Sequence, residues 1–138
     1  MAKKAYDKIT DYLSGVSASG DLSSYQYRAM YLASGSQVKL PDGSSSQLVI
    51  GVLHNEPADG EAAQVAYKSG DVTKLICAVT TCVIAVGNHV TADSSGYGVR
   101  ETTTGCPYFA RAMEATSGSG IISVLLERGV VTTASRNM

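Results

Sequence analysis

Nucleophilic catalysis in this chain would depend on two histidines, because His54 and His89 are the only imidazole side chains in its 138 residues. A histidine base must lie within hydrogen-bonding distance of its nucleophile, for which Cys106 and Ser119 are the candidates. The Ser-Gly-Ser-Gly sequence at residues 117–120 lacks the Gly-x-Ser-x-Gly spacing of a nucleophile elbow. We therefore interpret both histidines as strand-end or turn residues and predict no catalytic residue, so the protein is not expected to be an enzyme.

The most closely spaced acidic residues are Glu56, Asp59 and Glu61, which fall in one loop that also contains proline and glycine. Carboxylate oxygens bind hard cations, but this spacing does not match the twelve-residue calcium loop. We interpret the loop as a solvated acidic turn. The Gly-Lys-Ser/Thr signature of a phosphate-binding loop is also absent from the sequence. The sequence therefore predicts neither a metal site nor a cofactor.

Three cysteines, Cys77, Cys82 and Cys106, are an odd number and lack paired metal-ligand spacing. Cys77 and Cys82 lie in apolar sequence, where a free cysteine acts as a small hydrophobic side chain. A disulfide between these two would require the chain to turn back on itself, and a reducing cytoplasm opposes it. We expect free thiols.

The charge pattern argues against nucleic acid and membrane as partners. Eleven Lys and Arg residues nearly balance twelve Asp and Glu residues, and the basic ones are dispersed except near the N-terminus. Proteins that bind nucleic acids directly cluster their cations to neutralise phosphates. The longest apolar stretch, residues 75–86, is interrupted by two threonines and is shorter than the roughly 20 residues that span a bilayer. No secretory signal follows the basic N-terminus, so we expect synthesis in the cytoplasm.

Glycine-centred turns divide most of the chain into short apolar strands. Turns are predicted at Pro41-Asp42-Gly43 and at glycines 60, 70, 87, 96 and 118. Strands are predicted over residues 25–32, 37–40, 47–54, 62–68, 72–79, 83–86, 90–92, 107–114 and 121–128. This spacing is typical of an all-β fold, a single compact β-sandwich or barrel-like domain. A chain of this length can bury one sizeable core.

The N-terminal segment is the one place with a helical period. Apolar side chains recur there at spacings of three and four, at Tyr6, Ile9, Leu13 and Val16, with Tyr12 beside them. This pattern predicts a short helix over residues 6–13, and an isolated helix of two turns is marginal in water. Tyr6, Ile9, Tyr12 and Leu13 are therefore expected to dock on a neighbouring protein or, alternatively, on the chain's own β-domain.

The resulting organisation has three parts. Residues 1–24 form a helical or extended arm with its linker, residues 25–129 the β-rich domain, and residues 130–138 a tail without turn or core signals. Tyr25, Tyr27 and Tyr31 alternate along the first predicted strand and would share one face. Tyrosine is enriched at interfaces, so this face is expected either to contact a second copy of the chain or to enter the core.

Six segments of the chain carry a resemblance to a known family. They are Ile-Gly-Val at 50–52, Ala-Asp-Gly-Glu at 58–61, Val-Ala-Tyr at 65–67, Gly-Asn-His-Val-Thr-Ala-Asp at 87–93, Ala-Arg-Ala-Met-Glu-Ala at 110–115 and Ile-Ser-Val-Leu-Leu at 122–126. In this succession of turn glycines and small apolar strands, residues 25–128 resemble the capsid decoration, or cement, proteins of tailed bacteriophages. The N-terminal extension over residues 1–24 departs from the family pattern.

The resemblance implies a structural function on a virus particle. It implies a homotrimer that binds the major capsid protein on the outer surface of the expanded icosahedral capsid and stabilises the shell against the pressure of packed DNA. The protein would then be located in the virion. One alternative is a receptor- or glycan-binding β-module, although such sites stack sugars on aromatic side chains and this chain has no Trp and one Phe. A small hydrolase is the weaker alternative.

Overall fold

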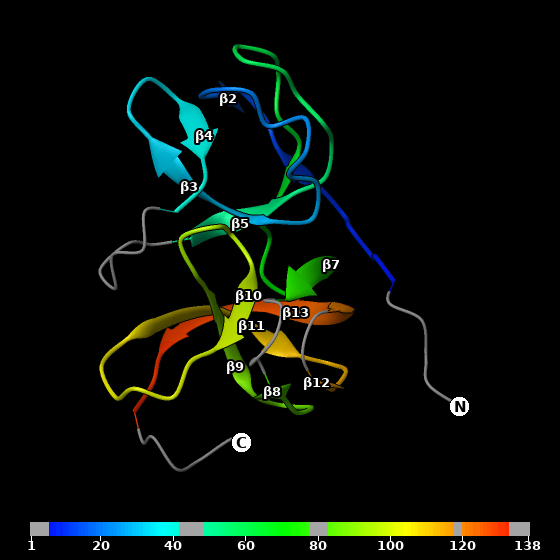
Figure 1. Cartoon of the computed structure of the whole chain (residues 1–138), viewed down its shortest axis with the longest axis vertical. Helices are drawn as coiled ribbons and strands as arrows, with labels where there is room; N and C mark the ends of the chain where they lie inside the picture. The colour runs from blue at the N-terminus through cyan, green and yellow to red at the C-terminus, as the bar shows by residue number, and fades with distance from the viewer. Residues whose placement is uncertain (1–5, 42–48, 78–82, 118–119, 133–138) are drawn as a thin grey trace.

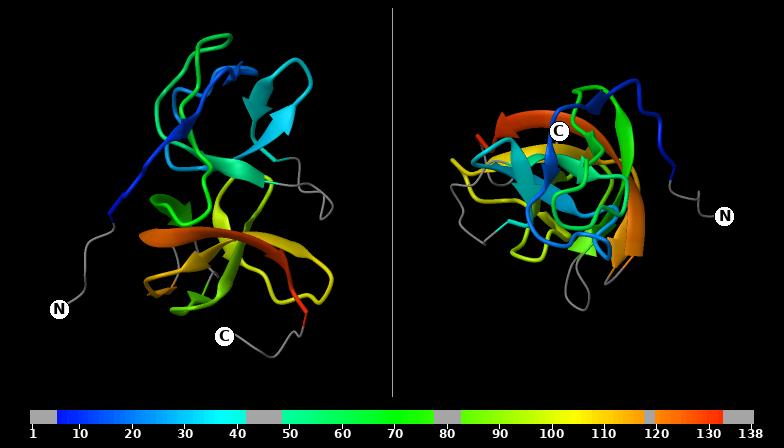
Figure 2. Two further views of the ribbon diagram at one scale, coloured as in Figure 1. Left: turned by 180° about the vertical axis from the view of Figure 1, so that it is seen from behind. Right: turned by 90° about the horizontal axis from the view of Figure 1, so that it is seen from above.

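The computed structural model describes residues 6–41, 49–77, 83–117 and 120–132 (Figure 1). Across these ranges every regular element is a strand and none is a helix, which confirms the predicted all-β fold. The strands form two main layers, a closed barrel and a six-stranded sheet. Figure 2 shows the same two layers from behind, with the sheet stacked on one end of the barrel.

The barrel has the strand order β10-β7-β13-β11-β9. Its strands are β7 (Val72–Cys77), β9 (His89–Ala92), β10 (Gly98–Arg100), β11 (Pro107–Ala112) and β13 (Gly120–Val130). The longest of them, β13, has 11 residues and pairs antiparallel with β7 on one side and with β11 on the other. Alternate side chains of these strands fill the interior, including those of Leu75, Val90, Phe109, Val124 and Leu126.

The six-stranded sheet has the order β1-β6-β5-β3-β4-β2. Its strands are β1 (Tyr12–Leu13), β2 (Ser17–Ala18), β3 (Ala29–Ala33), β4 (Gln37–Lys39), β5 (Val49–Leu53) and β6 (Val65–Ala66). Two further short strands, β8 (Val83–Ile84) and β12 (Thr116–Ser117), pair with each other. The side chains of Val16, Ala18 and Leu22, which precede the predicted β-rich domain, are buried in the core of this sheet.

The two layers share the central strands of the sheet because successive side chains of a strand point to opposite faces. On β5, Val52 belongs to the core of the barrel and Leu53 to the core of the sheet. The same division holds for Ala29 and Met30 on β3 and for Ala66 and Val65 on β6. The sheet is therefore covered on both faces, and the two cores are parts of one packed unit.

Close packing of β5 on β6 requires glycine at position 51. A Cβ atom at Gly51 would lie 2.1 Å from the carbonyl oxygen of Ala66, a backbone atom that cannot move aside. The predicted turns at glycines 60, 70, 87 and 96 are confirmed by the positive φ angles of these residues, which range from 79° to 96°. The predicted turns at glycines 43 and 118 and the cysteine at 82 lie outside the described residues. The Cys77 side chain is buried in the core of the barrel, and Cys106 is partly exposed.

The helix predicted over residues 6–13 is wrong. The segment is extended: Lys8 forms a β-bridge with Val72 of the barrel, and β1 pairs with β6 of the sheet. The apolar spacing had a different cause, because Ile9 packs against the core of the barrel and Leu13 against that of the sheet. A helix with a single apolar face could not serve two separate cores.

Two other predictions need correction. The strand predicted from residue 25 begins at Ala29, because Tyr27 lies in a turn with a φ of 63°. The loose tail predicted from residue 130 is wrong for its first residues, since Val130 ends β13 and Val131 is buried. The backbone N–H and carbonyl of Val131 bond to Cys106 and Gly105. Residues 133–138 lie outside the described part of the chain.

Candidate functional site at the junction of the two layers

Residues 6–13, called the strap here, cross the junction and tie the barrel to the sheet. At one end the backbone N–H of Tyr6 donates to Ser123 Oγ of β13 at 2.7 Å. Lys8 exchanges two backbone hydrogen bonds with Val72 of β7, at 2.7 and 3.0 Å. At the other end Tyr12 pairs with Ala66 of β6. Figure 1 shows this extended segment running along the right side of both layers.

The middle of the strap is fixed by a buried carboxylate. Asp71, which is 5% exposed, accepts hydrogen bonds from the backbone N–H of Thr10 at 2.9 Å and from its hydroxyl at 2.8 Å. Burial by itself would raise the pKa of Asp71, but the hydrogen bonds from Thr10 and from the backbone of Asp11 hold it below its ordinary value. The carboxylate therefore stays ionised and its bonds are structural.

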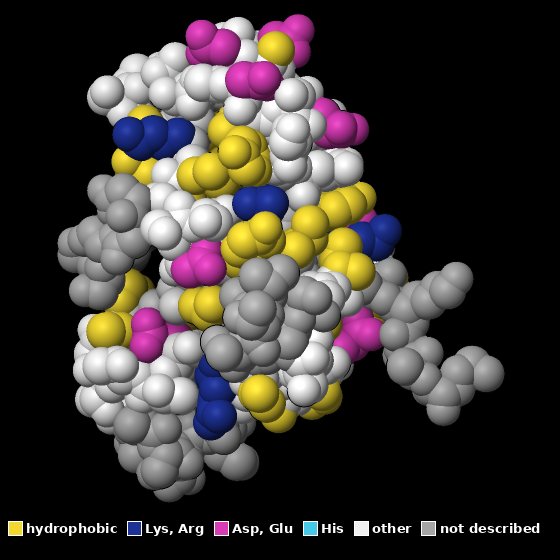
Figure 3. All heavy atoms as spheres, in the orientation of Figure 1, with side chains coloured by type: hydrophobic (Ala, Val, Ile, Leu, Met, Phe, Trp, Pro, Cys, Tyr) yellow, Lys and Arg dark blue, Asp and Glu magenta, His cyan; other side chains and the backbone are white. Residues whose placement is uncertain are grey.

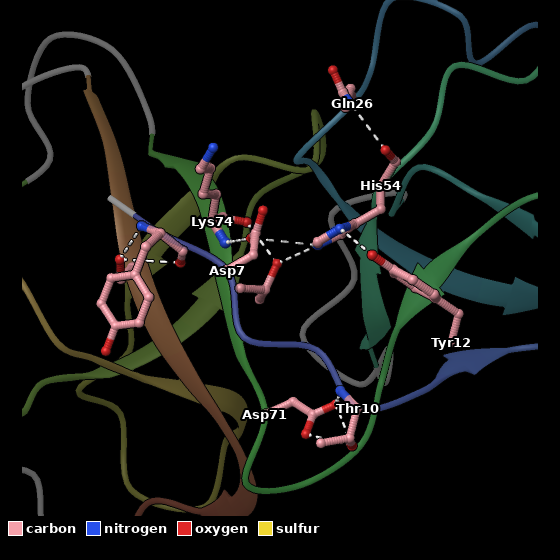
Figure 4. A network of polar contacts seen from close by, with 10 residues as sticks. Asp7, Thr10, Tyr12, Gln26, His54, Asp71 and Lys74 are labelled. Atoms are coloured by element: carbon pink, nitrogen blue, oxygen red, sulfur yellow. Dashed lines mark hydrogen bonds and ion pairs between the residues drawn. The ribbon is translucent and has the colours of Figure 1, made fainter. Parts of the chain in front are cut away.

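His54 lies at the centre of the polar network (Figure 4), and its partners fix its tautomer. Its Nε2 atom is 2.6 Å from Thr73 Oγ1, and that hydroxyl donates its one proton to the carbonyl of Lys74 at 3.0 Å. Nε2 must therefore carry the hydrogen and donate it to Thr73. The other nitrogen, Nδ1, then accepts from the Tyr12 hydroxyl at 3.2 Å.

The network contains the residue types of a hydrolytic triad, but its geometry is different. In a triad the carboxylate and the nucleophile bond to opposite nitrogens of the imidazole. Here Asp7 Oδ1 lies 3.8 Å from Nε2, the nitrogen that also bonds Thr73. The Thr73 side chain is fully buried and could not reach a substrate. Asp7 also accepts from the backbone N–H of Lys74 at 2.7 Å. The network binds the chain to itself.

Burial sets the protonation of the imidazole. Burial lowers the pKa of His54 below 6.5; the charge of Asp7 opposes this shift and that of Lys74 adds to it. Burial, together with the charge of Asp7 and the neighbouring Tyr27, raises the pKa of Tyr12. Both side chains are therefore neutral near pH 7, as the hydrogen bond between them requires.

The structure brings together members of the two predicted contact groups, because Tyr12 of the strap and Tyr27 both pack on the His54 ring. The ring centroids are 5.3 and 5.4 Å from that of His54. The left-handed backbone of Tyr27 is held by two hydrogen bonds, from its N–H to the Leu53 carbonyl and from the Ile76 N–H to its carbonyl. A strained residue of this kind persists only where its surroundings over-determine it. Tyr27 therefore links sheet and barrel.

The other predicted contact residues lie apart from this cluster. The Tyr25 ring is covered by the Arg28 guanidinium at 4.9 Å, and the Tyr31 ring lies 5.5 Å from the Lys39 ammonium. Tyr25, Tyr27 and Tyr31 thus have different partners within the chain and do not share one face. Their contact with a second copy stays a prediction, as does docking of the strap on a neighbour. Tyr6, at 39% exposed, is the most exposed of the four predicted strap contact residues.

The second histidine belongs to the wall of the barrel. The His89 ring stacks on Tyr108 with centroids 4.0 Å apart, and its Nε2 lies 3.2 Å from Arg111 Nη2. Burial and the charge of Arg111 lower the pKa of His89. Arg111 is in turn paired with Glu127 at 2.8 Å. The two histidines therefore serve separate parts of the fold, and Ser119 lies outside the described residues.

The carboxylates of the acidic loop bond backbone N–H groups of the loop itself and of the turn at Gly20. Asp59 accepts from the N–H of Gly20, and Glu61 accepts from that of Ala58. Several Asp and Glu side chains lie at the far end of the six-stranded sheet, as Figure 3 shows. Within the described ranges no three His, Cys, Asp or Glu side chains are placed to hold a metal ion. No helix long and apolar enough to cross a membrane occurs there either.

Sequence reasoning missed Arg128, whose guanidinium spans the junction on the side away from the strap. It donates to the carbonyls of Val49 and Ile50 on β5 and, at 3.3 Å, to that of Tyr67. Nothing in the local sequence could have identified it, because its partners lie 61 to 79 residues earlier in the chain. Partners this distant are set only by the tertiary fold.

Comparison with known proteins gives a match among solved structures. No protein-family model and no curated protein matches the chain. Among solved structures, the fold is similar to the crystal structure of the head fiber gp8.5 N base of bacteriophage phi29, with a TM-score of 0.62. The chain shares its fold with that base. The alignment covers 87% of this chain and 98% of that one at 16% sequence identity, so it is the fold that the match establishes.

Proposed function

We propose that this protein is a structural component of a bacteriophage head, a decoration or cement protein on the outer surface of the expanded icosahedral capsid. The observation that carries the proposal is the fold similarity to the phi29 head fiber base, which extends over 98% of that chain. The resemblance of residues 25–128 to capsid decoration proteins points to the same kind of particle. The partners would be the major capsid protein and two further copies of this chain.

The proposed mechanism is stabilisation by selective binding. A protein that binds the assembled, expanded lattice and not its separated subunits shifts the equilibrium toward the intact shell by mass action. In a homotrimer three weak contacts act together, so the avidity exceeds the single-site affinity by a factor on the order of 10² or more. No individual contact then needs to be strong.

The architecture is suited to bearing load. The sheet packs on both faces, and the strap and Arg128 join it to the barrel on two sides. A shell under pressure from packed DNA would pull on such a protein, and shared cores resist separation of the two layers. His54 and Asp71, which are residue types common in catalytic sites, bond to the strap and hold it in place. This use supports a non-enzymatic function that needs no cofactor.

The proposal is tested by binding to capsids. Purified protein is mixed with expanded shells that lack it and, separately, with compact procapsids, and the bound copies are counted after sedimentation. The mass of the free protein is measured in parallel. We expect a trimer of 14.3 kDa chains that saturates expanded shells at three copies per trivalent site and does not bind procapsids. Absence of binding to either shell would contradict the proposal, and glycan-array binding in its place would favour the receptor-binding alternative.

A further inference from the structure

A pocket of 330 Å³ opens at the junction on the side away from the strap. Four strands contribute to its lining, with Val49 of β5, Thr91 of β9, Tyr108 and Phe109 of β11, and Arg128 and Val130 of β13. In Figure 1 the strap runs along the right side of the molecule, whereas β5 begins and β13 ends on the left. Most of the lining is aromatic or aliphatic, and the guanidinium of Arg128 is its cationic group.

One wall of the pocket is held in place by the fold itself. Tyr108 pairs with Gly129 across β11 and β13, and a Cβ atom at Gly129 would lie 2.3 Å from the Tyr108 hydroxyl oxygen. Glycine at this position therefore lets the tyrosine side chain lie close over β13. The Tyr108 ring also stacks on the His89 ring, and the two ring planes are nearly parallel at 12°. These two contacts fix the position of the tyrosine ring in the wall.

The floor of the pocket coincides with an irregularity in the barrel. The register of β11 against β13 shifts between Tyr108 and Ala110, which is the mark of a β-bulge. Phe109, the residue at the shift, is 2% exposed and belongs to the core of the barrel. Bulges are over-represented next to binding sites because they re-aim side chains. Here the bulge places an aromatic residue beneath the opening.

The charge in the pocket is the feature that selects a ligand. The three acceptors of Arg128, on Val49, Ile50 and Tyr67, are backbone carbonyls and carry no formal charge. The ion pairs among the described residues join His54 with Asp7 and Arg111 with Glu127, and neither includes Arg128. Burial lowers the pKa of the Arg128 guanidinium, which is the effect of removing a cation from water. A carboxylate placed here would gain a charge-assisted contact.

We propose that this pocket binds a small aromatic carboxylate. The ring would lie on the apolar surface formed by Phe109, Val49 and Val130, and the carboxylate would face Arg128. A volume of 330 Å³ is at the lower end of the range of about 300 to 1,000 Å³ for ligand sites, which suits one ring or a fused pair. The proposal does not depend on the function in a phage head.

The test is a titration of the ¹⁵N-labelled full chain with indole-3-acetate, followed by NMR. Indole-3-acetamide, which has the same shape and no charge, is the matched control ligand. We expect saturable shifts confined to the amides around the pocket, with a Kd on the order of 1 mM for a ligand of this size. The acetamide should bind at least about threefold weaker, because it lacks the charge that complements Arg128.

A variant at Val130 tests the site without changing Arg128, which contributes to folding. Val130, at 52% exposed, lines the pocket, so Val130→Trp should fill it and abolish binding while the fold is retained. Leu32→Trp, at a 49% exposed position on β3, is the control that should leave binding unchanged. The proposal is overturned by absence of saturable shifts, by equal affinity for the two ligands, by shifts centred elsewhere, or by unchanged binding to the folded Val130→Trp variant.

Discussion

The junction between sheet and barrel is packed differently on its two sides. On the strap side, the space is filled by side chains around His54, and both of its ring nitrogens are bonded within the chain. On the other side, the long side chain of Arg128 crosses to the backbone of β5 and leaves a hollow beside it. The filled side brings together Asp7, His54 and Tyr12, and the lining of the pocket on the hollow side contains one cationic side chain, that of Arg128.

Residue type alone is therefore a poor guide to where a ligand would bind in this protein. Asp7, His54 and Thr73 include every side chain that a hydrolytic site would need, yet they are used against one another. The side that sequence reasoning passed over has the unfilled volume and the charge without an opposite charge. The two sides can be separated by mutation. One set of changes removes the strap, and the other weakens the hydrogen bonds of Arg128 to β5, called the clamp here.

The largest effect is expected from deletion of residues 1–13. It removes Ile9 from the barrel core, Leu13 from the sheet core and the hydrogen bonds of the strap. We expect the free energy of unfolding to fall by on the order of 4 kcal/mol. The measurement is urea unfolding, with deletion of residues 1–5 as the control that should have little effect. Equal midpoints for the two deletions would show that the strap does not hold the layers together.

A smaller loss is expected when the clamp on the hollow side is weakened. Arg128→Lys keeps the charge but loses the planar fork that reaches three carbonyls. We expect a loss of about 2 kcal/mol in the free energy of unfolding. Arg100→Lys, at the exposed end of β10, is the matched control and should change stability by less than about 0.5 kcal/mol. If the two variants unfold at the same urea concentration, the hydrogen bonds of Arg128 to β5 do not contribute the expected stability.

The third prediction concerns pH. Because burial lowers the pKa of His54 below 6.5, the unfolded chain takes up the proton more readily than the folded one. The contribution of His54 to stability is then complete above about pH 6.5 and declines as the pH falls toward its folded pKa. We expect the stability difference between wild type and His54→Gln to shrink from pH 8 to pH 5. His89 shifts in the same direction, so His89→Gln is measured beside it. A difference that stays constant with pH would contradict a buried neutral His54.

The smallest effect on stability is expected at the outer end of the strap. Tyr6 contributes its backbone to the fold, whereas its side chain is 39% exposed. Tyr6→Ala should therefore change stability by less than about 0.5 kcal/mol. If the strap also contacts a capsid or a neighbouring subunit, this substitution lowers affinity for expanded shells without unfolding the protein. Unchanged affinity would sink the predicted docking role of this residue.

The fold class could be predicted from the sequence because its signals are local. Glycine-centred turns and alternating apolar residues report on φ angles and strand faces within a few positions, and the turns at Gly60, Gly70, Gly87 and Gly96 were found in this way. The strap could not be predicted, because Ile9 and Leu13 at helical spacing pack on different cores. A spacing of four residues between apolar side chains does not show whether they pack on one core or on two.

The sites at the junction depend on contacts between distant parts of the chain. Tyr27 adopts a positive φ because Leu53 and Ile76 bond to its backbone, and no local signal predicts this for an aromatic residue. Arg128 reaches Val49, 79 residues away, only after the sheet has packed on the barrel. The prediction of single tyrosines as contact residues used residue type and local spacing and could not tell which of them the fold would use internally.

The proposed reinforcement of a phage head is tested by the heat resistance of DNA-filled heads. Heads assembled without the protein are heated alone and after saturation with it, and the temperature at which DNA becomes accessible to an intercalating dye is recorded. We expect a higher release temperature for saturated heads, rising with occupancy. An unchanged release temperature at full occupancy would contradict a stabilising function.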